Sequence, residues 1–433
     1  MKSRKVRNVA VVAGVRTPFC KAGGAFVRRS AVELGAAAAR EAVLSLGIRP
    51  ERLDQVIFGI VSAPVGAPNI AREVVLQAAF PSTIPAYTVS RACVSANQAV
   101  TNAADQIALG RADVVLAGGA ETLSDVPILY GRRFRDALFA ASKAKTPMAR
   151  LRAFQKVRPQ DLAPVAPAIA EPSTGETMGE SAEKMAKDFG VRREDQDLFA
   201  ANSHARAVAA WEAGHFKGRV AAVSAPKGGS GLQIVERDDH PRADSTLDKL
   251  AKLRPVFDRK VGSVTAGNAS PLTDGASAVI LAAEEVARAE GWPILGILRD
   301  YEYAAVDPFE HLLMGPVAAV ARAVDRNELA LSDFGVIEMH EAFAAQVLAN
   351  IHGLGSDSYC REKLGRSGAV GEIDPAFVNQ WGGSISLGHP FGATGGRLIM
   401  MLLDQMAAKD AQFGLVSACA AGAMGSAMIF ERV

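Results

Sequence analysis

A glycine-rich stretch near the end of the chain constrains the backbone more tightly than any other segment. Residues 388–397 read Gly-His-Pro-Phe-Gly-Ala-Thr-Gly-Gly-Arg, and an apolar run that favours a helix follows at residues 398–403. Glycine lacks a Cβ, so the chain can turn sharply or approach a ligand closely, and Pro390 suits the first turn of a helix. The stretch predicts a tight turn that holds one imidazole, His389, at a helix start. The structural alternative is a histidine that only caps the helix, and such a cap needs fewer glycines.

The order of strand, turn and helix occurs twice along the chain, which predicts two similar halves. The matching segments are helices 32–46 and 317–324, strands 55–60 and 335–339, helices 95–109 and 398–406, and strands 113–117 and 414–418. Cys93 and His389 occupy equivalent places, each in a turn just before a helix. Alternating apolar strands and helices predict an α/β fold with a largely parallel sheet. Two fused copies would bring both helix starts to a shared interface.

Between the halves the composition changes, which predicts an inserted, mostly helical loop domain at residues 122–255. The N-terminal half would cover residues 1–121, completed by about residues 256–285, and the C-terminal half residues 286–433. Within the insert, Leu129–Arg158 carries nine lysines and arginines against one aspartate. Apolar side chains at helical spacing accompany this charge. The segment therefore suits an anionic membrane surface or a partner subunit, or a solvated face that attracts an anionic substrate.

Composition and charge favour some classes of protein and argue against others. The chain has 433 residues, a formal net charge of +2, 49% hydrophobic residues and 22% charged residues. These values are ordinary for a globular enzyme and argue against a nucleic-acid-binding protein. We see no signal-like leader and no membrane-spanning run, so we expect a cytoplasmic location. The four cysteines have neither CxxC nor zinc-finger spacing, which predicts free thiols and no bound metal.

Four residues at predicted strand ends or helix starts carry groups suited to catalysis: Cys93, His340, His389 and Cys419. Open α/β sheets bind ligands at the carboxyl ends of their strands. A cysteine at a helix start is expected to have a lowered pKa, because the helix dipole and free N–H groups favour the thiolate. Each residue also has a structural interpretation, as an inert buried cysteine or a core histidine. His340 does not form a zinc-protease motif, since Ala344 stands where the second histidine would be.

The motifs around these residues resemble those of the thiolase family over essentially the whole chain. The matching blocks are Cys93-Val-Ser-Ala, Gly118-Gly-Ala-Glu, Thr177-Met-Gly-Glu-Ser-Ala-Glu, Thr265-Ala-Gly-Asn-Ala-Ser, Thr273-Asp-Gly-Ala, His340-Glu-Ala-Phe, Gly388-His-Pro-Phe-Gly-Ala-Thr-Gly and the turn at Cys419. Most thiolases have asparagine where this chain has His340, and glycine where it has Ala421. These departures and the basic insert resemble the β subunit (3-ketoacyl-CoA thiolase) of the fatty-acid oxidation trifunctional complex and its bacterial relatives. The resemblance implies a duplicated, layered α/β fold.

The resemblance also implies an activity, the cleavage of 3-ketoacyl-CoA by coenzyme A in fatty acid β-oxidation. Cys93 would attack the 3-keto carbon while His389 accepts the thiol proton. Cys419 would protonate the acetyl-CoA enolate as a general acid. His340 and His389 would donate hydrogen bonds to the thioester oxygen and so stabilise the enolate.

Further expectations from the resemblance concern binding and partners. The backbone N–H groups of Cys93 and Ala421 would face the acyl-enzyme oxyanion, Ser270 would contact the pantetheine arm, and Met178 would line the pocket. Coenzyme A is a substrate, and no cofactor is expected. The protein would form a homodimer or a larger homo-oligomer. A hydratase/dehydrogenase partner subunit and a peripheral membrane contact through residues 129–158 are further expectations.

Other functions remain open at this stage. An acetoacetyl-CoA thiolase that works in the synthetic direction would use the same residues. A catalytically silent, thiolase-like subunit that only binds acyl-CoA is a second alternative, and the presence of Cys93, His389 and Cys419 argues against it. A condensing enzyme of the same superfamily is a third, and those enzymes replace the second cysteine.

Overall fold

The computed structural model describes residues 6–165, 170–227 and 231–433. It separates into two compact units, a large one formed by residues 1–125 and 171–433 and a small one formed by residues 126–170. The small unit is shorter than the predicted insert, because residues 171–255 belong to the large unit. The large unit contains every residue that the sequence assigned to catalysis.

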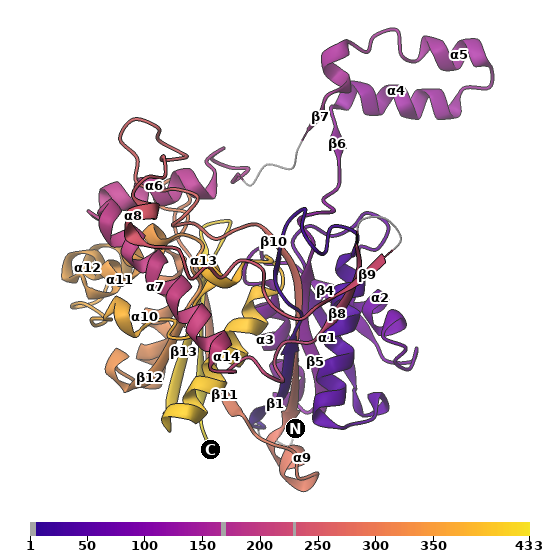
Figure 1. Ribbon diagram of the computed structural model, residues 1–433. Helices are drawn as coiled ribbons and strands as arrows, with labels where there is room; N and C mark the ends of the chain where they lie inside the picture. The colour runs from indigo at the N-terminus through magenta and orange to yellow at the C-terminus, as the bar shows by residue number, and fades with distance from the viewer. Residues whose placement is uncertain (1–5, 166–169, 228–230) are drawn as a thin grey trace. The chain divides into compact units, whose positions relative to one another are not determined.

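A single ten-stranded sheet forms the centre of the large unit (Figure 1). Its strand order is β12 (Phe334–Met339), β13 (Phe413–Ala420), β14 (Met424–Glu431), β11 (Gly296–Ala305), β1 (Val9–Arg16), β10 (Thr273–Ala283), β5 (Val114–Glu121), β3 (Gln55–Gly59) and β4 (Ala86–Val89). The short strand β2 (Cys20–Lys21) pairs with the start of β10. The two halves of the chain meet where β1 and β11 pair antiparallel.

The prediction of a largely parallel sheet is wrong. Only three neighbouring pairs in this sheet are parallel, β12 with β13, β3 with β4, and β3 with β5. The other pairs are antiparallel, and the short turn between β13 and β14 leaves no room for a crossover between parallel strands. Strand β10 is buried along its whole length. A continuous apolar run is typical of parallel strands, but here helices cover both faces of antiparallel strands as well.

The predicted duplication is confirmed by the order of strands and helices. In the first half β1, β10, β5 and β3 lie side by side, and in the second half β11, β14, β13 and β12 repeat this order. Helix α3 (Ser95–Ala108) precedes β5, and α14 (Thr394–Lys409) precedes β13. Cys93 and His389 therefore lie in equivalent turns, as the sequence predicted.

Three hydrophobic clusters define the layers of the large unit. One packs α1 (Ala31–Leu46) and α2 (Ile70–Gln77) on the outer face of the first half-sheet, and another packs α10 (Gly315–Asn327) and α11 (Ala344–Gly355) on the second. The third holds α3 and α14 between the two half-sheets. Each fully buried large side chain there, such as Ile107 or Leu403, contributes about 1.5–3 kcal/mol. This middle layer brings the two helix starts together.

Glycine allows the two middle helices to approach closely. A Cβ added to Gly395, in the first turn of α14, would lie 2.1 Å from Oδ1 of Asn97 in α3. No side chain fits in that space, so the glycines of the 388–397 stretch serve packing as well as the turn.

The remaining elements of the large unit surround this core. They are α6 (Met178–Asp188), α7 (Arg193–Glu212), α8 (Leu247–Leu250), α9 (Glu284–Ala289), α12 (Asp357–Leu364), α13 (Ser384–Leu387) and the hairpin of β8 (Val223–Lys227) with β9 (Gly231–Val235). Helix α6 begins with a capping box in which Thr177 and Glu180 bond each other's backbone N–H groups. Among the described residues, no helix is long and apolar enough to cross a lipid bilayer.

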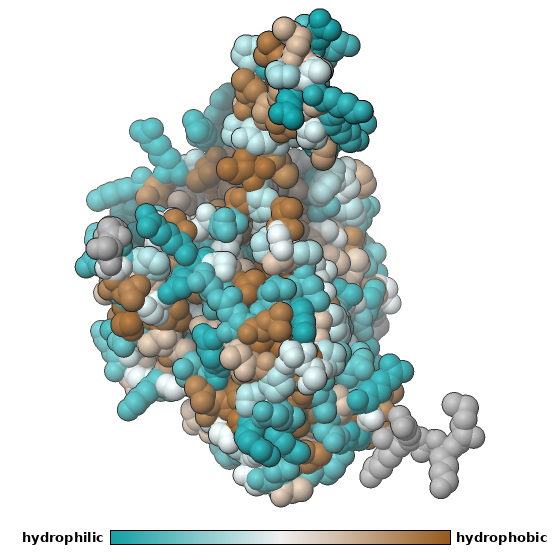
Figure 2. All heavy atoms as spheres, turned by 90° about the vertical axis from the view of Figure 1, so that its right-hand side faces the viewer, coloured by the Kyte–Doolittle hydropathy of each residue, from teal (hydrophilic) through white to brown (hydrophobic). Residues whose placement is uncertain are grey.

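The small unit is a helical hairpin with few buried side chains. It consists of β6 (Leu129–Tyr130), α4 (Arg132–Lys143), α5 (Pro147–Arg152) and β7 (Pro164–Val165). The ring of Phe134 contacts the rings of Tyr130 and Phe154, and Ala137 is buried. Hydrophobic and hydrophilic side chains are both exposed on its surface (Figure 2). The exposed hydrophobic residues include Phe139, Met148 and Leu151.

Candidate active site

Cys93 lies in a strained turn between β4 and α3. The preceding residue, Ala92, has a φ of 45°, a left-handed conformation that is uncommon for a residue with a side chain. Cys93 remains partly accessible to solvent. Its Sγ accepts a hydrogen bond from the backbone N–H of Ala421, in the turn after β13. The turn thus presents the thiol to the second half of the molecule.

The expectation that the helix start lowers the pKa of Cys93 is wrong. Burial of the sulfur, reinforced by the negative charge of Glu121, raises the pKa of Cys93 to about 12, although the backbone N–H groups of Ala421 and Cys93 act in the opposite direction. Desolvation disfavours the thiolate more than the local dipoles favour it. At neutral pH the resting group is therefore a thiol, and it needs a base to become a nucleophile.

Hydrogen bonds within its own turn fix the orientation of the His389 ring. Its Nδ1 lies 2.6 Å from Oγ1 of Thr394, and that hydroxyl donates to the carbonyl oxygen of Pro390 at 3.0 Å. The Nε2 atom is buried and has no hydrogen-bond partner among the described residues. Burial, followed by the nearby rings and charges of His340 and Arg397, holds the pKa of His389 well below its usual value. The imidazole is neutral at physiological pH.

His340 follows β12 directly and faces His389. The two ring centroids are 4.0 Å apart, with the ring planes at 46°. Nδ1 of His340 lies 2.8 Å from Oγ of Ser384, and its Nε2 is buried with no hydrogen-bond partner in residues 6–165, 170–227 and 231–433. Burial and the charge of Arg397 lower the pKa of His340 to about 3. Two neutral imidazoles thus each leave one ring nitrogen free.

Cys93, His340 and His389 form one constellation, in which the three donor atoms lie within 4.8 Å of one another. This separation is close enough for a soft divalent cation as well as for proton transfer. A metal held there would occupy the sulfur that the reaction needs. The absence of a metal from the working site stays a prediction.

Cys419 lies near the end of β13, the strand that ends just before Ala421. It is the penultimate residue of β13, it pairs with Gly425 of β14, and it is buried. Burial, and then the negative charge of a thiolate at Cys93, raises the pKa of Cys419 well above its usual value. The two cysteines come from different halves of the chain, and Cys419 lies two residues before Ala421, whose backbone N–H bonds Sγ of Cys93.

The residues predicted to bind the substrate are less closely tied to this group. The backbone N–H of Ser270 donates to the carbonyl oxygen of Ala342 at 2.9 Å, which places Ser270 beside the loop that carries His340. Met178 is the first residue of α6 and packs against the hydrophobic cluster that contains Cys419. Their contacts with coenzyme A stay predictions.

Several buried polar residues support the site and were not singled out from the sequence. Glu121, at the end of β5, accepts hydrogen bonds from the backbone N–H groups of Val61, Ser62 and Gly392. Burial raises the pKa of Glu121 to about 7. Glu341, next to His340, accepts from Asn379, Ser203 and Ile385. Both residues stand in blocks of the family resemblance, Glu121 in Gly118-Gly-Ala-Glu and Glu341 in His340-Glu-Ala-Phe, and this was the signal in the sequence, since their partners are remote along the chain.

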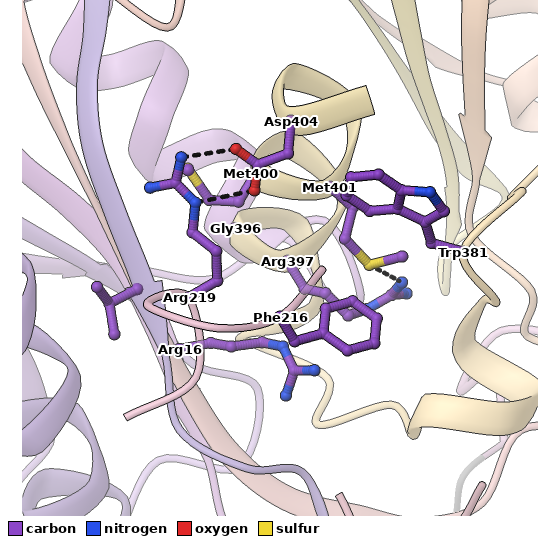
Figure 3. A pocket seen from close by; sticks show the side chains of 10 residues that line it. Arg16, Phe216, Arg219, Trp381, Gly396, Arg397, Met400, Met401 and Asp404 are labelled. Carbon is purple, nitrogen blue, oxygen red and sulfur yellow. Dashed lines mark hydrogen bonds and ion pairs between the residues drawn. The ribbon is translucent and has the colours of Figure 1, made fainter. Parts of the chain in front are cut away.

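A small cavity lies on the other side of α14 and does not belong to this constellation. It measures about 10 Å³, the space of one water molecule. Figure 3 shows the Arg219–Asp404 ion pair at its wall and the side chain of Arg397, whose Nη1 lies 3.4 Å from Sδ of Met401. The cavity is too small for a substrate.

The family to which the chain belongs follows from comparison with known proteins. The model of the N-terminal thiolase domain matches residues 9–285, and the model of the C-terminal thiolase domain matches residues 292–432. The chain therefore belongs to the thiolase family, a family of acyltransferases.

Individual relatives agree with this assignment. Proteins named 3-ketoacyl-CoA thiolase from Yersinia pestis (strain Pestoides F) and Yersinia pseudotuberculosis serotype O:3 (strain YPIII) are 46% identical over 429 residues, covering 99% of this chain and 98% of theirs. Among solved structures, Bacillus anthracis acetyl-CoA acetyltransferase matches with a TM-score of 0.85 and 32% identity, covering both chains completely. Human mitochondrial 3-ketoacyl-CoA thiolase matches with a TM-score of 0.83 and 30% identity, over 99% of this chain and all of the other.

Proposed function

We propose that the protein catalyses the cleavage of 3-ketoacyl-CoA by coenzyme A, which yields acetyl-CoA and an acyl-CoA shortened by two carbons. The observation that carries this proposal is the constellation of Cys93, His340 and His389, with Cys419 electrostatically coupled to Cys93. A nucleophile, a neutral base and a second acid/base group are the set that such a reaction needs. The names of relatives that match the whole chain support the same substrate class.

In the first half-reaction Cys93 forms a covalent acyl-enzyme. Nε2 of His389 accepts the thiol proton, Sγ bonds to the 3-keto carbon of the substrate, and the bond between the α and β carbons breaks. The electron pair of that bond passes to the acetyl-CoA enolate, and Cys419 delivers a proton to its α carbon. The raised pKa values of both cysteines suit this exchange, because each starts as a protonated thiol.

In the second half-reaction coenzyme A releases the shortened acyl group. The thiolate of Cys419 takes the proton of the incoming coenzyme A thiol, whose sulfur attacks the thioester at Cys93. The sulfur of Cys93 leaves and recovers its proton from His389. Both half-reactions balance without an oxidant, a reductant or a cofactor, and coenzyme A is a substrate.

Two sets of donors are placed to stabilise the negative oxygens. The backbone N–H of Ala421 already points at Sγ of Cys93 and would face the acyl-enzyme oxyanion together with the N–H of Cys93. The side chain of His340, and that of His389 once its Nε2 holds the proton of Cys93, would donate to the thioester oxygen of the enolate. Removing one such donor typically costs ~10²–10³ in rate. Ser270 would contact the pantetheine arm, and Met178 would line the acyl pocket.

A second candidate is the reverse reaction, the synthesis of acetoacetyl-CoA from two acetyl-CoA molecules. The likeness to Bacillus anthracis acetyl-CoA acetyltransferase supports this direction. The relatives at higher identity carry the degradative name, so we favour cleavage. A non-catalytic acyl-CoA-binding role fits the site less well, because the nucleophile and both acid/base groups are present.

The setting of the reaction is part of the proposal. We place the enzyme in the cytoplasm, as a homodimer or a larger homo-oligomer, within fatty acid β-oxidation. A partner subunit with hydratase and dehydrogenase activity would supply 3-ketoacyl-CoA. The exposed basic and apolar side chains of residues 129–158 suit either such a partner or the anionic surface of a membrane.

Thiolysis assays of the purified protein with a series of 3-ketoacyl-CoA substrates and free coenzyme A test this function. We expect acetyl-CoA and the shortened acyl-CoA in equal amounts, with a preferred chain length that the series identifies. Acetoacetyl-CoA formation that exceeds thiolysis of every longer substrate would favour the synthetic alternative. Binding of acyl-CoA without any turnover would favour the non-catalytic one.

A further inference from the structure

The hydroxyl groups behind the two catalytic imidazoles differ in the direction of their hydrogen bonds. Behind His389, Oγ1 of Thr394 donates its only hydrogen to the carbonyl oxygen of Pro390. The same oxygen lies 2.6 Å from Nδ1 of His389. Since the hydroxyl hydrogen is already used, the ring must be the donor in the second contact. His389 therefore carries its proton on Nδ1.

Behind His340 the hydrogen bond between hydroxyl and imidazole runs in the opposite direction, because an arginine already donates to the hydroxyl oxygen. Nη2 of Arg397 donates to Oγ of Ser384 at 2.7 Å, and a guanidinium can only donate. Both side chains are buried, so the hydrogen of Ser384 needs an acceptor. Among the described residues, the acceptor within hydrogen-bond distance of this hydroxyl is Nδ1 of His340, at 2.8 Å. His340 therefore accepts at Nδ1 and carries its proton on Nε2.

We propose that Ser384, held by Arg397, and Thr394 are positioning residues that fix opposite tautomers on His340 and His389. The free Nε2 of His389 is then a bare acceptor, and the free Nε2–H of His340 is a donor. Both atoms are buried and have no hydrogen-bond partner in the part of the chain that the structure describes. This inference rests on the proposed function of the site, and it explains how two adjacent identical side chains divide the work of base and oxyanion donor.

The same hydrogen bonds matter for the histidine at position 340, where most thiolases have asparagine. An asparagine amide always offers an N–H donor, so it needs no support to present one. A neutral imidazole offers a donor or an acceptor at Nε2, depending on its tautomer. Histidine at this position therefore makes the site depend on the hydroxyl of Ser384 in a way that asparagine would not.

Nitrogen-15 NMR of the full chain labelled in histidine reads the tautomers directly. Ring nitrogens with and without a hydrogen resonate in well-separated regions, and loss of one signal set in the His340→Asn protein assigns His340. We expect a protonated Nε2 in His340 and a protonated Nδ1 in His389 near neutral pH. The same tautomer on both rings would overturn the proposal. The measurement requires no turnover, so a protein with these tautomers but without thiolysis would contradict the proposed function and still support this inference.

A double-mutant cycle separates positioning from a general structural role. We expect Ser384→Ala to lower kcat about tenfold with little change in KM, less than the ~10²–10³ that loss of a whole oxyanion donor costs. In the His340→Asn background the same change should alter kcat by no more than about twofold, the usual limit for independent sites. Ser384→Thr, which keeps the hydroxyl, should retain most of the activity.

The cycle has a clear contrary outcome. The loss of a bond to Arg397 is the same in both backgrounds, so it cancels from the comparison. An equal loss of kcat in the wild-type and His340→Asn backgrounds would show that Ser384 acts on packing alone and would overturn the proposal. If Ser384→Ala does not fold, the spectrum of the unmodified protein still decides the tautomers.

Discussion

The carbonyl oxygen of Gly392 occupies the place where a side chain on Gly119 would begin. A Cβ added to Gly119 would lie 1.8 Å from that oxygen and 2.9 Å from the carbonyl oxygen of Gly59. The turn that carries His389 thus rests directly on the backbone of β5. Because all these neighbours are backbone atoms, they cannot move aside as a flexible side chain would.

This contact leads to a prediction about stability. Gly119→Ala should destabilise the protein by about 1–3 kcal/mol, the usual cost of overpacking, and lower kcat because the turn at His389 must shift. Gly66→Ala is the matched control, since a Cβ there meets nothing within 4 Å. Urea unfolding and thiolysis of the two variants check the prediction. Equal unfolding free energies of the two variants would show that the turn at His389 can shift without a loss of stability.

The role of Cys419 predicts a selective defect. Cys419→Ala should leave acylation of Cys93 measurable but should slow exchange of the α protons of acetyl-CoA with solvent by at least about 100-fold, the lower end of the range for general acid–base groups. Nuclear magnetic resonance of acetyl-CoA in deuterated buffer follows this exchange. Exchange at the wild-type rate would assign the acid/base role to another residue.

The buried carboxyl of Glu121 predicts a pH dependence of stability. Its pKa is raised from 4.5 to about 7, so the folded protein binds more protons than the unfolded chain between these values, and stability falls as pH rises through this window. The loss is at most about 3 kcal/mol, since one pKa unit corresponds to about 1.4 kcal/mol.

Glu121→Gln removes this titration and should flatten the change in unfolding free energy between pH 5 and pH 8. Urea unfolding at several pH values compares the variant with the parent protein. An identical pH profile in the two proteins would show that Glu121 does not titrate in that window.

The basic hairpin predicts salt-sensitive association. Changing Arg132, Arg133 and Arg135 to glutamate should abolish binding to anionic vesicles or to a partner subunit while thiolysis of short substrates is retained. Exposed charges interact more weakly as salt rises. The same change at the exposed residues Arg28, Arg49 and Arg111 of the large unit is the control for net charge. Unchanged co-sedimentation and partner capture would leave a solvated face as the explanation.

Local patterns in the sequence were sufficient to predict the duplication and the equivalent turns of Cys93 and His389. Apolar periodicity and glycine position are properties of short segments. Helix α3 begins at Ser95 as predicted, whereas α14 begins at Thr394, before the predicted start at residue 398. Strand direction was not predictable in this way, because a strand buried on both faces, such as β10, has the same composition whichever way it runs.

The pKa values of the site residues depend on contacts between segments that are remote in sequence, so they could not be predicted from the sequence. The helix start indicated a lowered pKa for Cys93, whereas burial among residues from both halves raises it. Ser384 and Arg397 lie within or beside the motif of His389, yet their link to His340 appears only in the folded chain. A motif identifies which residues matter, and the fold decides their protonation.

The central claim is that Cys93 carries the acyl group. Mass spectrometry of the protein after mixing with a 3-ketoacyl-CoA, without free coenzyme A, tests this most directly. We expect an added mass equal to the shortened acyl group, located on the peptide that contains Cys93, lost on addition of coenzyme A and absent from a folded Cys93→Ala variant. The same adduct on the Cys93→Ala protein, or on a peptide without Cys93, would contradict it.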